Sequence, residues 1–514
     1  MARSEKFTSS ATIKKVYAEN INSKGVPIYS ENGQVYCDNG ENHIKVVGNS
    51  GSGKTQGEVL PLIDNIINSG ESAIVTDLKG ELTRLKAKDA IDKGYNTIII
   101  DMRNPYQSPS HWDPLASIRN SYNEGTIAGR DAAASQIADF AYAIQTKCDD
   151  QFWPNSSAEL VRGLIYLLLE QAPENEINIK SLCDMMLSIN ERIGAEIAIK
   201  KIRNELPNNS QAKRDLSTYC NAPNDTRNSI YSVASNSLGQ FSQNEGIMRL
   251  MTNDTISISS LDIEDKPLLC FVIIPDESSC YSGLAAILIN QLMSHFLKLA
   301  DKKPNGRLPH RLWLILEELG NVGSSIKDLD KWMTGARSRN IRMCLVLQSD
   351  TSQLVDIYGE SKAQTINGTC GITIGFSTNN WQTLEEWSKR CGNITVFEHG
   401  VFREEALISP TQLAAMPKGM ALVMINGQYK YISQFPMYYK THENIENIDS
   451  LYEEANKNFY PEVNVFDLVK FVKTADKRKR EELFSQKMNE DQAIEKFKRD
   501  LLGESVDIDS LFND

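Results

Sequence analysis

A glycine-rich turn near residue 50 constrains the fold of this chain more than any other stretch. The apolar run 44–47 precedes it, and apolar residues at helical spacing, 59–67, follow it. A turn of this kind between a strand and a helix, ending in Lys-Thr, has the form of a phosphate-binding P-loop. The residues of the turn are Gly48, Asn49, Ser50, Gly51, Ser52, Gly53, Lys54 and Thr55.

The turn predicts a site for a nucleoside triphosphate with Mg²⁺. Its glycines let backbone N–H groups converge on a phosphate with no Cβ in the way. The helix N-terminus adds unpaired donors and the positive end of its dipole, so we expect the whole turn to surround the phosphates. Lys54 is expected to reach the β- and γ-phosphates, and the Thr55 hydroxyl to bind Mg²⁺. ATP and Mg²⁺ are the expected cofactors.

Two acidic residues far along the chain are expected to complete this site. The apolar run 312–316 is followed by Glu317 and Glu318. Adjacent side chains at a strand end point to different sides, so one faces the metal and the other the γ-phosphate. We assign Glu317 to the metal and Glu318 to the attacking water. Aspartate is usual at the first position, and the extra methylene of Glu317 is expected to slow turnover.

Basic and amide side chains flank the next predicted strand, 343–347. Gln348 follows it, where a strand beside the P-loop strand ends, so its amide is placed to sense the γ-phosphate. Arg337, Arg339 and Arg342 precede it. Arg339 and Arg342 fit an ordinary solvated helix face. In a ring of subunits, a guanidinium here reaches a neighbour's nucleotide and stabilises the transition-state charge.

Strand-like and helical stretches alternate, which predicts an α/β fold with a mostly parallel sheet flanked by helices. Residues 118–258 instead have helical spacing almost throughout and predict an inserted all-α domain. The nucleotide-binding domain is then 1–117 with 259–440. The charged segment 441–514 is expected to be an exposed helix or partly disordered.

Length and composition limit the number of domains and the class of protein that the chain can form. A chain of 514 residues suggests two or three domains. The net charge of −12 argues against a protein that is basic throughout, although a local basic channel is compatible with it. Nine scattered cysteines without zinc spacing indicate reduced thiols in the cytoplasm. The apolar segment 284–297 is interrupted by polar residues and is expected to be a core helix.

Beyond the P-loop, motifs in consistent order across residues 40–430 resemble the type IV coupling proteins of the TraG/TraD kind. They are Thr76-Asp77-Leu78-Lys79-Gly80-Glu81, Trp112-Asp113-Pro114-Leu115, Phe152-Trp153, Ile274-Pro275-Asp276, Ile315-Leu316-Glu317-Glu318-Leu319-Gly320-Asn321, Leu347-Gln348-Ser349, Gln353-Leu354, Tyr358-Gly359 and Leu407-Ile408-Ser409-Pro410. The resemblance implies a RecA-like P-loop ATPase that acts as a homo-hexameric ring. It implies delivery of relaxase-bound single-stranded DNA, or of protein, to the subunits of a type IV secretion channel. It places the family's trans-acting arginine on Arg337 and its glutamine on Gln348.

Three departures from the family pattern qualify this resemblance. Leu78 stands where the family has proline, and Glu317 where it has aspartate. The paired N-terminal membrane helices of the family are absent. The expectation is either a naturally soluble branch, recruited to the inner face of the cell membrane by a separate membrane partner, or a shortened chain.

Two other functions stay open beside an ATP-driven DNA or protein transporter. A nucleotide-gated receptor or scaffold with little turnover is favoured by Glu317. An FtsK-type DNA translocase shares the core, but Phe152-Trp153 and the size of the insertion argue against it. Sequence-independent backbone contacts to DNA are expected from basic residues of the insertion, each of which fits a solvated helix face equally well. These residues are Lys200, Lys201, Arg203, Lys213, Arg214 and Arg227.

Overall fold

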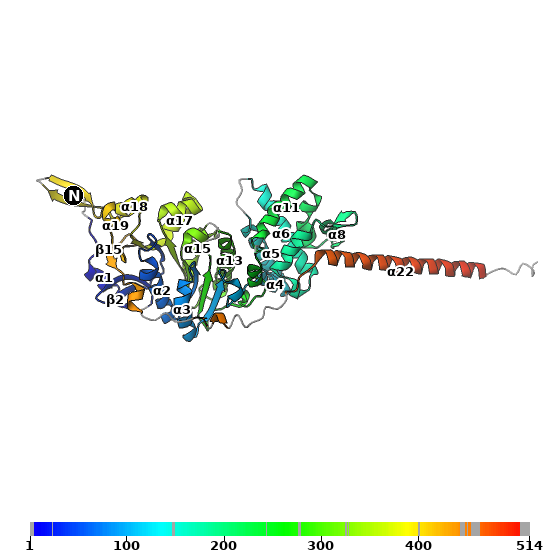
Figure 1. Ribbon diagram of the computed structural model, residues 1–514, viewed down its shortest axis with the longest axis horizontal. Coiled ribbons are helices and arrows are strands. Elements are labelled where there is room, and N and C mark those ends of the chain that lie inside the picture. The colour runs from blue at the N-terminus through cyan, green and yellow to red at the C-terminus, as the bar shows by residue number, and fades with distance from the viewer. Residues whose placement is uncertain are drawn as a thin grey trace, which may run out of the picture. The chain divides into compact units, whose positions relative to one another are not determined.

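The chain forms two compact units, which are described separately (Figure 1). Unit 1 comprises 1–146 and 236–463, and unit 2 comprises 147–235 and 464–514. The computed structural model describes residues 5–22, 24–145, 150–242, 244–275, 279–323, 326, 328–398, 401–442, 448–449, 451–453 and 463–503. Asp276 of the predicted motif 274–276 and the end of the predicted tail, 504–514, lie outside these residues.

Unit 1 is built on a nine-stranded sheet with the order β15-β14-β11-β3-β10-β9-β4-β8-β5. All neighbours from β5 to β11 are parallel, and β14 and β15 are added antiparallel at one edge. This confirms the predicted α/β class. The strands are β3 (His43–Val47), β4 (Ser72–Asp77), β5 (Asn96–Asp101), β8 (Leu268–Ile273), β9 (Leu312–Leu316), β10 (Ile341–Leu347), β11 (Cys370–Phe376), β14 (Met420–Ile425) and β15 (Tyr429–Gln434).

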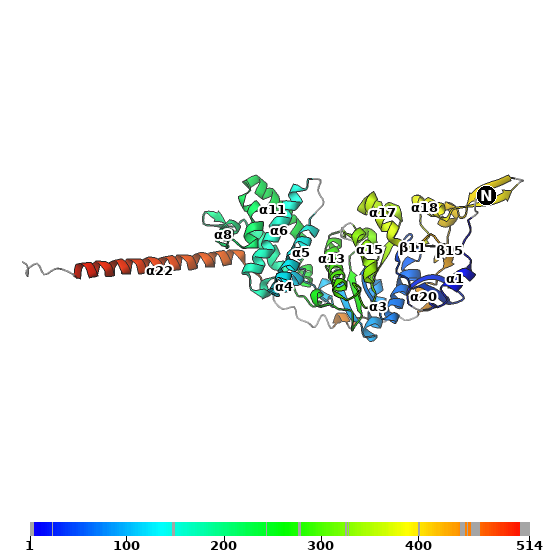
Figure 2. The same cartoon turned by 180° about the vertical axis from the view of Figure 1, so that it is seen from behind.

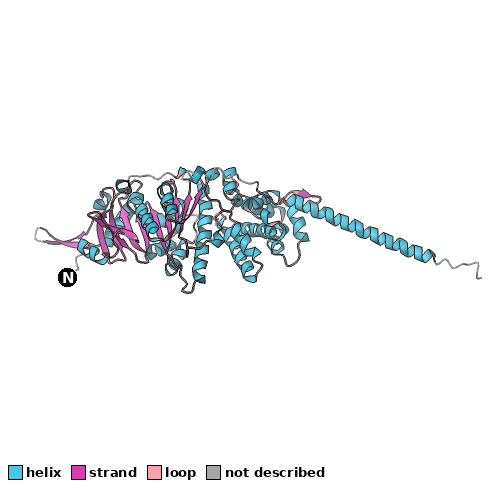
Figure 3. Ribbon diagram, turned by 90° about the horizontal axis from the view of Figure 1, so that it is seen from below, coloured by secondary structure: helices cyan, strands magenta, loops and turns pink. Residues whose placement is uncertain are grey.

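Helices cover both faces of this sheet (Figures 2 and 3). Every residue of β3, β4, β8, β9 and β10 is buried, as two-sided coverage requires. On one face, Val46, Ile315 and Val346 share a hydrophobic cluster with α2 and α3. The long helices of unit 1 are α2 (Leu60–Ser69), α3 (Glu81–Asp92), α5 (Ile127–Ala143), α13 (Ser279–Lys302), α15 (Leu329–Ala336), α16 (Thr351–Tyr358), α17 (Glu360–Thr369) and α18 (Trp381–Cys391).

Shorter elements complete unit 1. A β1–β2 hairpin precedes the P-loop strand, and a separate β12–β13 hairpin follows α18. The elements are α1 (Ser10–Val16), β1 (Val26–Glu31), β2 (Gln34–Asp38), α4 (Ala116–Asn123), α12 (Glu245–Leu250), α14 (Leu319–Val322), β12 (Asn393–Glu398), β13 (Val401–Ala406), α19 (Pro410–Ala414) and α20 (Tyr438–Thr441), with 3₁₀ turns at Pro105–Gln107, Ile258–Ser260 and Arg337–Arg339.

One described helix is long and apolar enough to span a membrane by length and composition alone. It is the segment Tyr281–Lys302 of α13, with a mean hydropathy of 1.3. An apolar window of this segment is 56% buried within the protein, which is the character of a core helix.

Unit 2 is helical, with α6 at its centre. α6 has thirteen buried residues and packs against neighbours that include α7, α9 and α10. The C-terminal segment from residue 464 onward belongs to this unit: Asn178 Nδ2 donates to the Asn464 carbonyl at 2.9 Å, and Lys479 Nζ on the C-terminal helix lies 3.0 Å from Glu205 Oε1. The elements are α6 (Phe152–Gln171), α7 (Ile179–Ser188), β6 (Arg192–Ile193), β7 (Glu196–Ile197), α8 (Ala198–Glu205), α9 (Gln211–Asp215), α10 (Ser217–Asn221) and α22 (Leu468–Gly503), with a 3₁₀ turn at Glu174–Glu176; α11 (Asn224–Gly239) begins here and ends in unit 1.

The division between the units differs from the predicted boundaries at 118 and 258. Helices α4, α5 and α12 group with the sheet because they pack within unit 1. Trp112 N donates to the Leu250 carbonyl at 3.0 Å, and the rings of Phe140 and Phe241 lie 5.8 Å apart. Helical spacing therefore identified the helices but not the unit to which each belongs.

Candidate functional site

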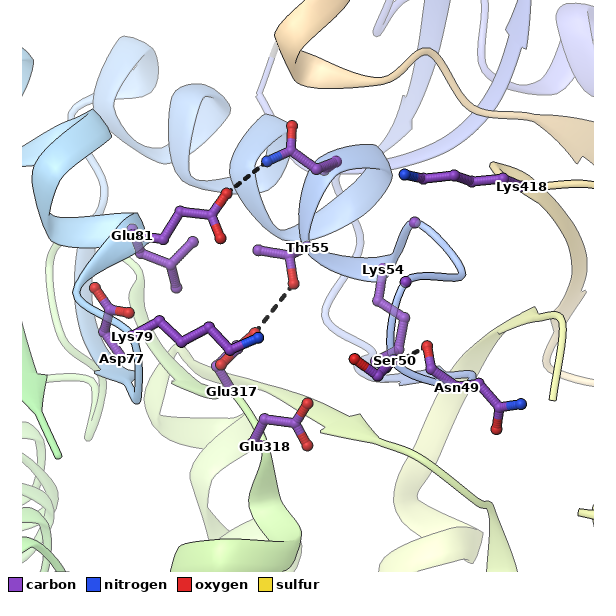
Figure 4. A pocket seen from close by; sticks show the side chains of 14 residues that line it. Asn49, Ser50, Lys54, Thr55, Asp77, Lys79, Glu81, Glu317, Glu318 and Lys418 are labelled. Carbon is purple, nitrogen blue, oxygen red and sulfur yellow. Dashed lines mark hydrogen bonds between the residues drawn. The ribbon is translucent and has the colours of Figure 1, made fainter. Parts of the chain in front are cut away.

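A pocket of about 260 Å³ lies at the carboxyl ends of β3, β4 and β9 (Figure 4). This is the edge at which parallel α/β sheets bind ligands. Its lining residues come from the P-loop, from the turn after β4 and from the end of β9, with one further lysine. They are Asn49, Ser50, Gly51, Gly53, Lys54, Thr55, Gln56, Asp77, Lys79, Glu81, Leu82, Glu317, Glu318 and Lys418. Gly48 and Ser52 belong to the same turn but do not line the pocket.

The P-loop backbone explains its glycines. Gly51 and Gly53 have φ values of +79° and +111°, in the left-handed region that side chains rarely adopt. A Cβ on Gly48 would lie 2.7 Å from Ser52 Oγ, so the close turn excludes one. The chain continues from this turn into a single π-helical turn, Thr55–Val59, before α2 begins.

Lys54 is buried inside the turn that it terminates. Its Nζ donates to the carbonyls of Gly48 at 2.5 Å and Asn49 at 3.1 Å. Burial lowers the pKa of the ammonium, and the nearby Glu318 and Glu317 act in the opposite direction. The lysine charge is thus held in the pocket by carbonyls and carboxylates, where phosphate oxygens are its natural partners.

Glu317 joins the end of β9 to the P-loop. Thr55 Oγ1 donates to Glu317 Oε1 at 3.0 Å. Burial, followed by the charges of Glu318 and Asp77, raises the pKa of Glu317 to about 7, against the lowering effects of Thr55 and Lys54. A hydroxyl and a carboxylate beside a phosphate site fit Mg²⁺, which takes few protein ligands together with phosphate oxygens. No group of three or more His, Cys, Asp or Glu side chains suited to a metal occurs among the described residues.

Gln348 contacts Glu318, which lines the pocket. Gln348 Nε2 donates to Glu318 Oε2 at 3.0 Å. Gln348 follows β10, which pairs with β3 on one side and β9 on the other, so its predicted position beside the P-loop strand is confirmed. Glu318 has φ +52° and ψ +55°, a conformation that costs a non-glycine residue free energy and is concentrated at functional sites.

A buried ion pair holds the loop that carries Gln348. Lys45, on the P-loop strand, pairs with Asp350, whose side chain is 0% exposed. Trp387 Nε1 donates to the second carboxylate oxygen of Asp350 at 2.8 Å. Thr378 Oγ1 donates to the Gln348 carbonyl at 3.2 Å. Through Asp350, the loop from Gln348 to Asp350 is therefore attached to Lys45 of β3 and to Trp387 of α18.

Arg337 lies away from the pocket of its own chain. It precedes β10, at the amino ends of strands whose carboxyl ends form the pocket. Its side chain is 60% exposed, and its Nε lies 3.8 Å from Glu41 Oε2. The structure therefore does not bring Arg337 together with the other predicted site residues, and its role in trans stays a prediction.

Several pocket residues were not predicted from the sequence. Lys79 and Glu81 line the pocket and follow β4, a predicted strand that ends in Asp77. Their position just after the carboxyl end of a strand was the signal that could have identified them. Asp77 Oδ2 accepts from Thr83 N and Oγ1 at 2.8 Å, so it caps the start of α3. Lys418 had no local signal. It reaches the pocket because Gly419 N donates to the Ser52 carbonyl at 3.1 Å.

Most basic residues predicted to contact DNA are engaged within unit 2. Lys201 pairs with Asp476, and Lys213 Nζ donates to the Leu206 carbonyl at 2.7 Å. Arg203, Arg214 and Arg227 donate to Ser217, Gln211 and Asn224, respectively, and Lys200 is half-buried. These contacts are those of helix faces with local partners, and the DNA role stays a prediction.

The sequence matches a protein family. A model of the family described as "Type IV secretory system Conjugative DNA transfer" matches residues 3–463. Two curated Escherichia coli relatives, both called conjugal transfer protein TraG, are 24% and 23% identical to this chain over 381 and 396 residues. The alignments cover 71% and 73% of this chain but only 57% and 58% of the relatives' length.

Solved structures share the fold. The plasmid coupling protein TrwB in complex with ADP and Mg²⁺ has a TM-score of 0.64 at 19% identity, covering 87% of this chain and 96% of that one. An unbound form of TrwBdeltaN70 has a TM-score of 0.62 at 20% identity, covering 85% and 93%. The similarity shows the predicted fold, a RecA-like P-loop ATPase fold with a mostly parallel central sheet.

Proposed function

Because the chain belongs to the type IV secretory system conjugative DNA transfer family, among coupling proteins of the TraG/TraD kind, we propose that it is an ATPase that moves substrate toward a secretion channel. The observation that carries this proposal is the hydrogen bond between Thr55 and Glu317, which unites the P-loop with the acidic end of β9 in one pocket. Magnesium-bound ATP supplies the phosphoryl group and the charge on which the surrounding residues act.

Each side chain has a distinct role in this proposal. The P-loop N–H groups and Lys54 bind the phosphates, and Thr55 and Glu317 hold the metal. Glu318 polarises the attacking water and accepts its proton, and Gln348 positions Glu318 through the hydrogen bond between them. The ion pair of Lys45 and Asp350 keeps the Gln348 loop in register with the P-loop strand.

The partners follow from the family. The substrate is single-stranded DNA held by sequence-independent contacts, attached to a relaxase, or a secreted protein, and the channel is a type IV secretion apparatus. The active form is a homo-hexamer on the inner face of the cell membrane, recruited there by a membrane partner. Arg337 supports the ring, since an exposed guanidinium remote from its own pocket is free to reach a neighbour's nucleotide.

Glu317 also favours a second function, a receptor whose nucleotide sets conformation with little turnover. The carboxylate is one methylene longer than the usual aspartate, and burial favours its protonated form, with a pKa of about 7. A protonated carboxyl does not bind the metal, so the raised pKa weakens Glu317 as a ligand at neutral pH, and the extra methylene moves the carboxylate from the position an aspartate would give it.

DNA-stimulated ATP hydrolysis separates the two functions. We expect single-stranded DNA to raise the turnover of the wild-type protein, and Lys54→Ala to abolish both nucleotide binding and turnover. ATP binding without hydrolysis, with or without DNA, would establish the receptor instead. Absence of ATP binding by the wild-type protein would overturn both.

A further inference from the structure

An exposed aromatic ring lies at one end of the pocket and has no part in the roles assigned above. It belongs to Tyr439 on α20, and the side chain is 54% exposed. Tyr439 N donates to Gln56 Oε1 at 3.2 Å, and Lys418 Nζ lies 5.8 Å from the centre of the ring. Gln56 and Lys418 both line the pocket, so the ring borders it through two of its wall residues.

The positions of the acidic residues indicate which way a nucleotide would lie in the pocket. Glu317, Glu318 and Gln348 mark the end at which the terminal phosphate reacts. Lys418 lies across Lys54 from Glu318 in Figure 4, and Gln56 continues the helix one residue beyond Thr55. A triphosphate placed with its last phosphate at Glu318 therefore directs its nucleoside toward Gln56 and Lys418, the end at which Tyr439 stands.

The neighbouring residues hold α20 in place while leaving this ring open. Lys86 Nζ donates to Tyr438 Oη at 2.5 Å, and the Tyr438 ring stacks on His442 with centres 3.9 Å apart. A Cβ on Gly57 would lie 3.0 Å from Met437 Cε, so the residue before α20 packs directly on the first turn of the P-loop helix. The position of Tyr439 is thus fixed relative to the P-loop by contacts that do not use its own ring.

We propose that Tyr439 is the base-binding residue of the nucleotide site, with its ring as a stacking platform for a purine. The proposal rests on the proposed function, because it assumes a nucleotide bound by the P-loop. An aromatic face stacks on any base and binds the larger purine surface better than a pyrimidine. ATP and GTP should therefore bind with similar affinity, and both more tightly than CTP.

The test compares ATP with inorganic tripolyphosphate, which keeps the phosphates and lacks the base. Binding of each in the presence of Mg²⁺ is measured by calorimetry. Wild type is expected to bind ATP more tightly than tripolyphosphate. Tyr439→Ala is expected to weaken ATP binding by about 5- to 100-fold, the range for loss of one stacked base, and to leave tripolyphosphate binding within about twofold. Tyr439→Phe keeps the ring and is expected to bind ATP as wild type does.

Phe397→Ala, which removes another exposed aromatic ring on the remote strand β12, is the matched control and is expected to change neither affinity. Unchanged ATP binding in Tyr439→Ala, or equal losses for ATP and tripolyphosphate, would overturn the stacking role. Equal wild-type affinity for the two ligands would also overturn it while leaving the P-loop site intact. A wild-type protein that binds neither ligand would overturn the proposed function itself.

Discussion

Thr55 and Glu317 stand 262 positions apart in the chain, yet Thr55 Oγ1 donates to Glu317 Oε1 across 3.0 Å. The sheet order explains the contact, since β10 is the single strand between β3 and β9 and all three are parallel. Their carboxyl ends therefore meet at one edge. The hydroxyl and carboxylate that the sequence assigned to Mg²⁺ are brought together by this arrangement.

Magnesium-dependent nucleotide binding should depend on pH through Glu317. Its pKa is raised to about 7, and a metal ligand must be deprotonated. Mg²⁺·ATP affinity is expected to be constant above pH 8 and to fall below pH 7, approaching tenfold per unit as protons compete with the metal. The affinity for Mg²⁺·ATP is measured by calorimetry between pH 5.5 and 8.5. The Glu317→Gln variant should lose the pH dependence. Equal slopes in the two proteins would contradict the metal-ligand role.

Replacement of Glu58 should stabilise the protein. Glu58 is 0% exposed in the π-helical turn, neither carboxyl oxygen has a hydrogen-bond partner among the described residues, and burial raises its pKa well above the usual value. A raised pKa gives stability that is present below the unfolded-state pKa and is lost as pH rises toward the folded-state value. Glu58→Met is therefore expected to raise the free energy of unfolding by about 1–3 kcal/mol, and more at pH 8 than at pH 5.

Urea unfolding at the two pH values measures this gain. The control is Glu404→Met, which replaces an exposed carboxylate on β13 and should leave stability unchanged within about 0.5 kcal/mol. A Glu58→Met protein that is less stable than wild type at pH 8 would show that the carboxylate has a partner in solution.

The buried pair of Lys45 and Asp350 should behave as a unit. Either Lys45→Met or Asp350→Ala leaves one charge buried without its partner, and each is expected to cost about 3–5 kcal/mol of unfolding free energy. The double variant should recover part of that loss. ATP turnover should remain low in it, because the loop of Gln348 has lost its attachment to β3. Full turnover in a folded double variant would exclude this positioning role.

Arg337 offers a test of action between subunits. Arg337→Ala is expected to lower turnover by 10³-fold or more, on the scale of an arginine finger, while ATP affinity stays within about threefold. The reason is that the side chain lies outside its own pocket and pairs only loosely with Glu41 at 3.8 Å. Arg339 is the last residue of the same 3₁₀ turn, and its Nε lies 2.8 Å from Asp301 Oδ1, so Arg339→Ala is the matched control. Unchanged turnover of Arg337→Ala in a confirmed oligomer would refute the trans role.

Local patterns were sufficient to predict the centre of the site. The glycine-rich turn that ends in Lys54-Thr55 follows one strand, and Glu317 follows the apolar run 312–316, so each marks the carboxyl end of a strand within a few residues. Because parallel strands share that edge, two such signals predict a common pocket before any contact is known. Gln348 was predicted for the same reason.

Long-range packing produced what the sequence did not predict. Lys418 lines the pocket because Gly419 bonds to Ser52, and Tyr439 is held beside the pocket wall by its bond to Gln56; each bond joins residues hundreds of positions apart. The grouping of α22 with unit 2 depends on pairs such as Lys479 with Glu205. The residue pattern of a single segment does not predict such contacts, because they depend on how segments distant in the chain pack together.

The decisive variant for the catalytic role of the acidic end of β9 is Glu318→Gln. It keeps the size and hydrogen bonding of the side chain that contacts Gln348 and removes only its ability to take a proton. ATP binding and DNA-stimulated hydrolysis are measured on the same preparation. We expect ATP affinity within about threefold of wild type and hydrolysis reduced by at least about 100-fold. Hydrolysis at the wild-type rate would contradict it, because the acidic end of β9 would then have no part in catalysis.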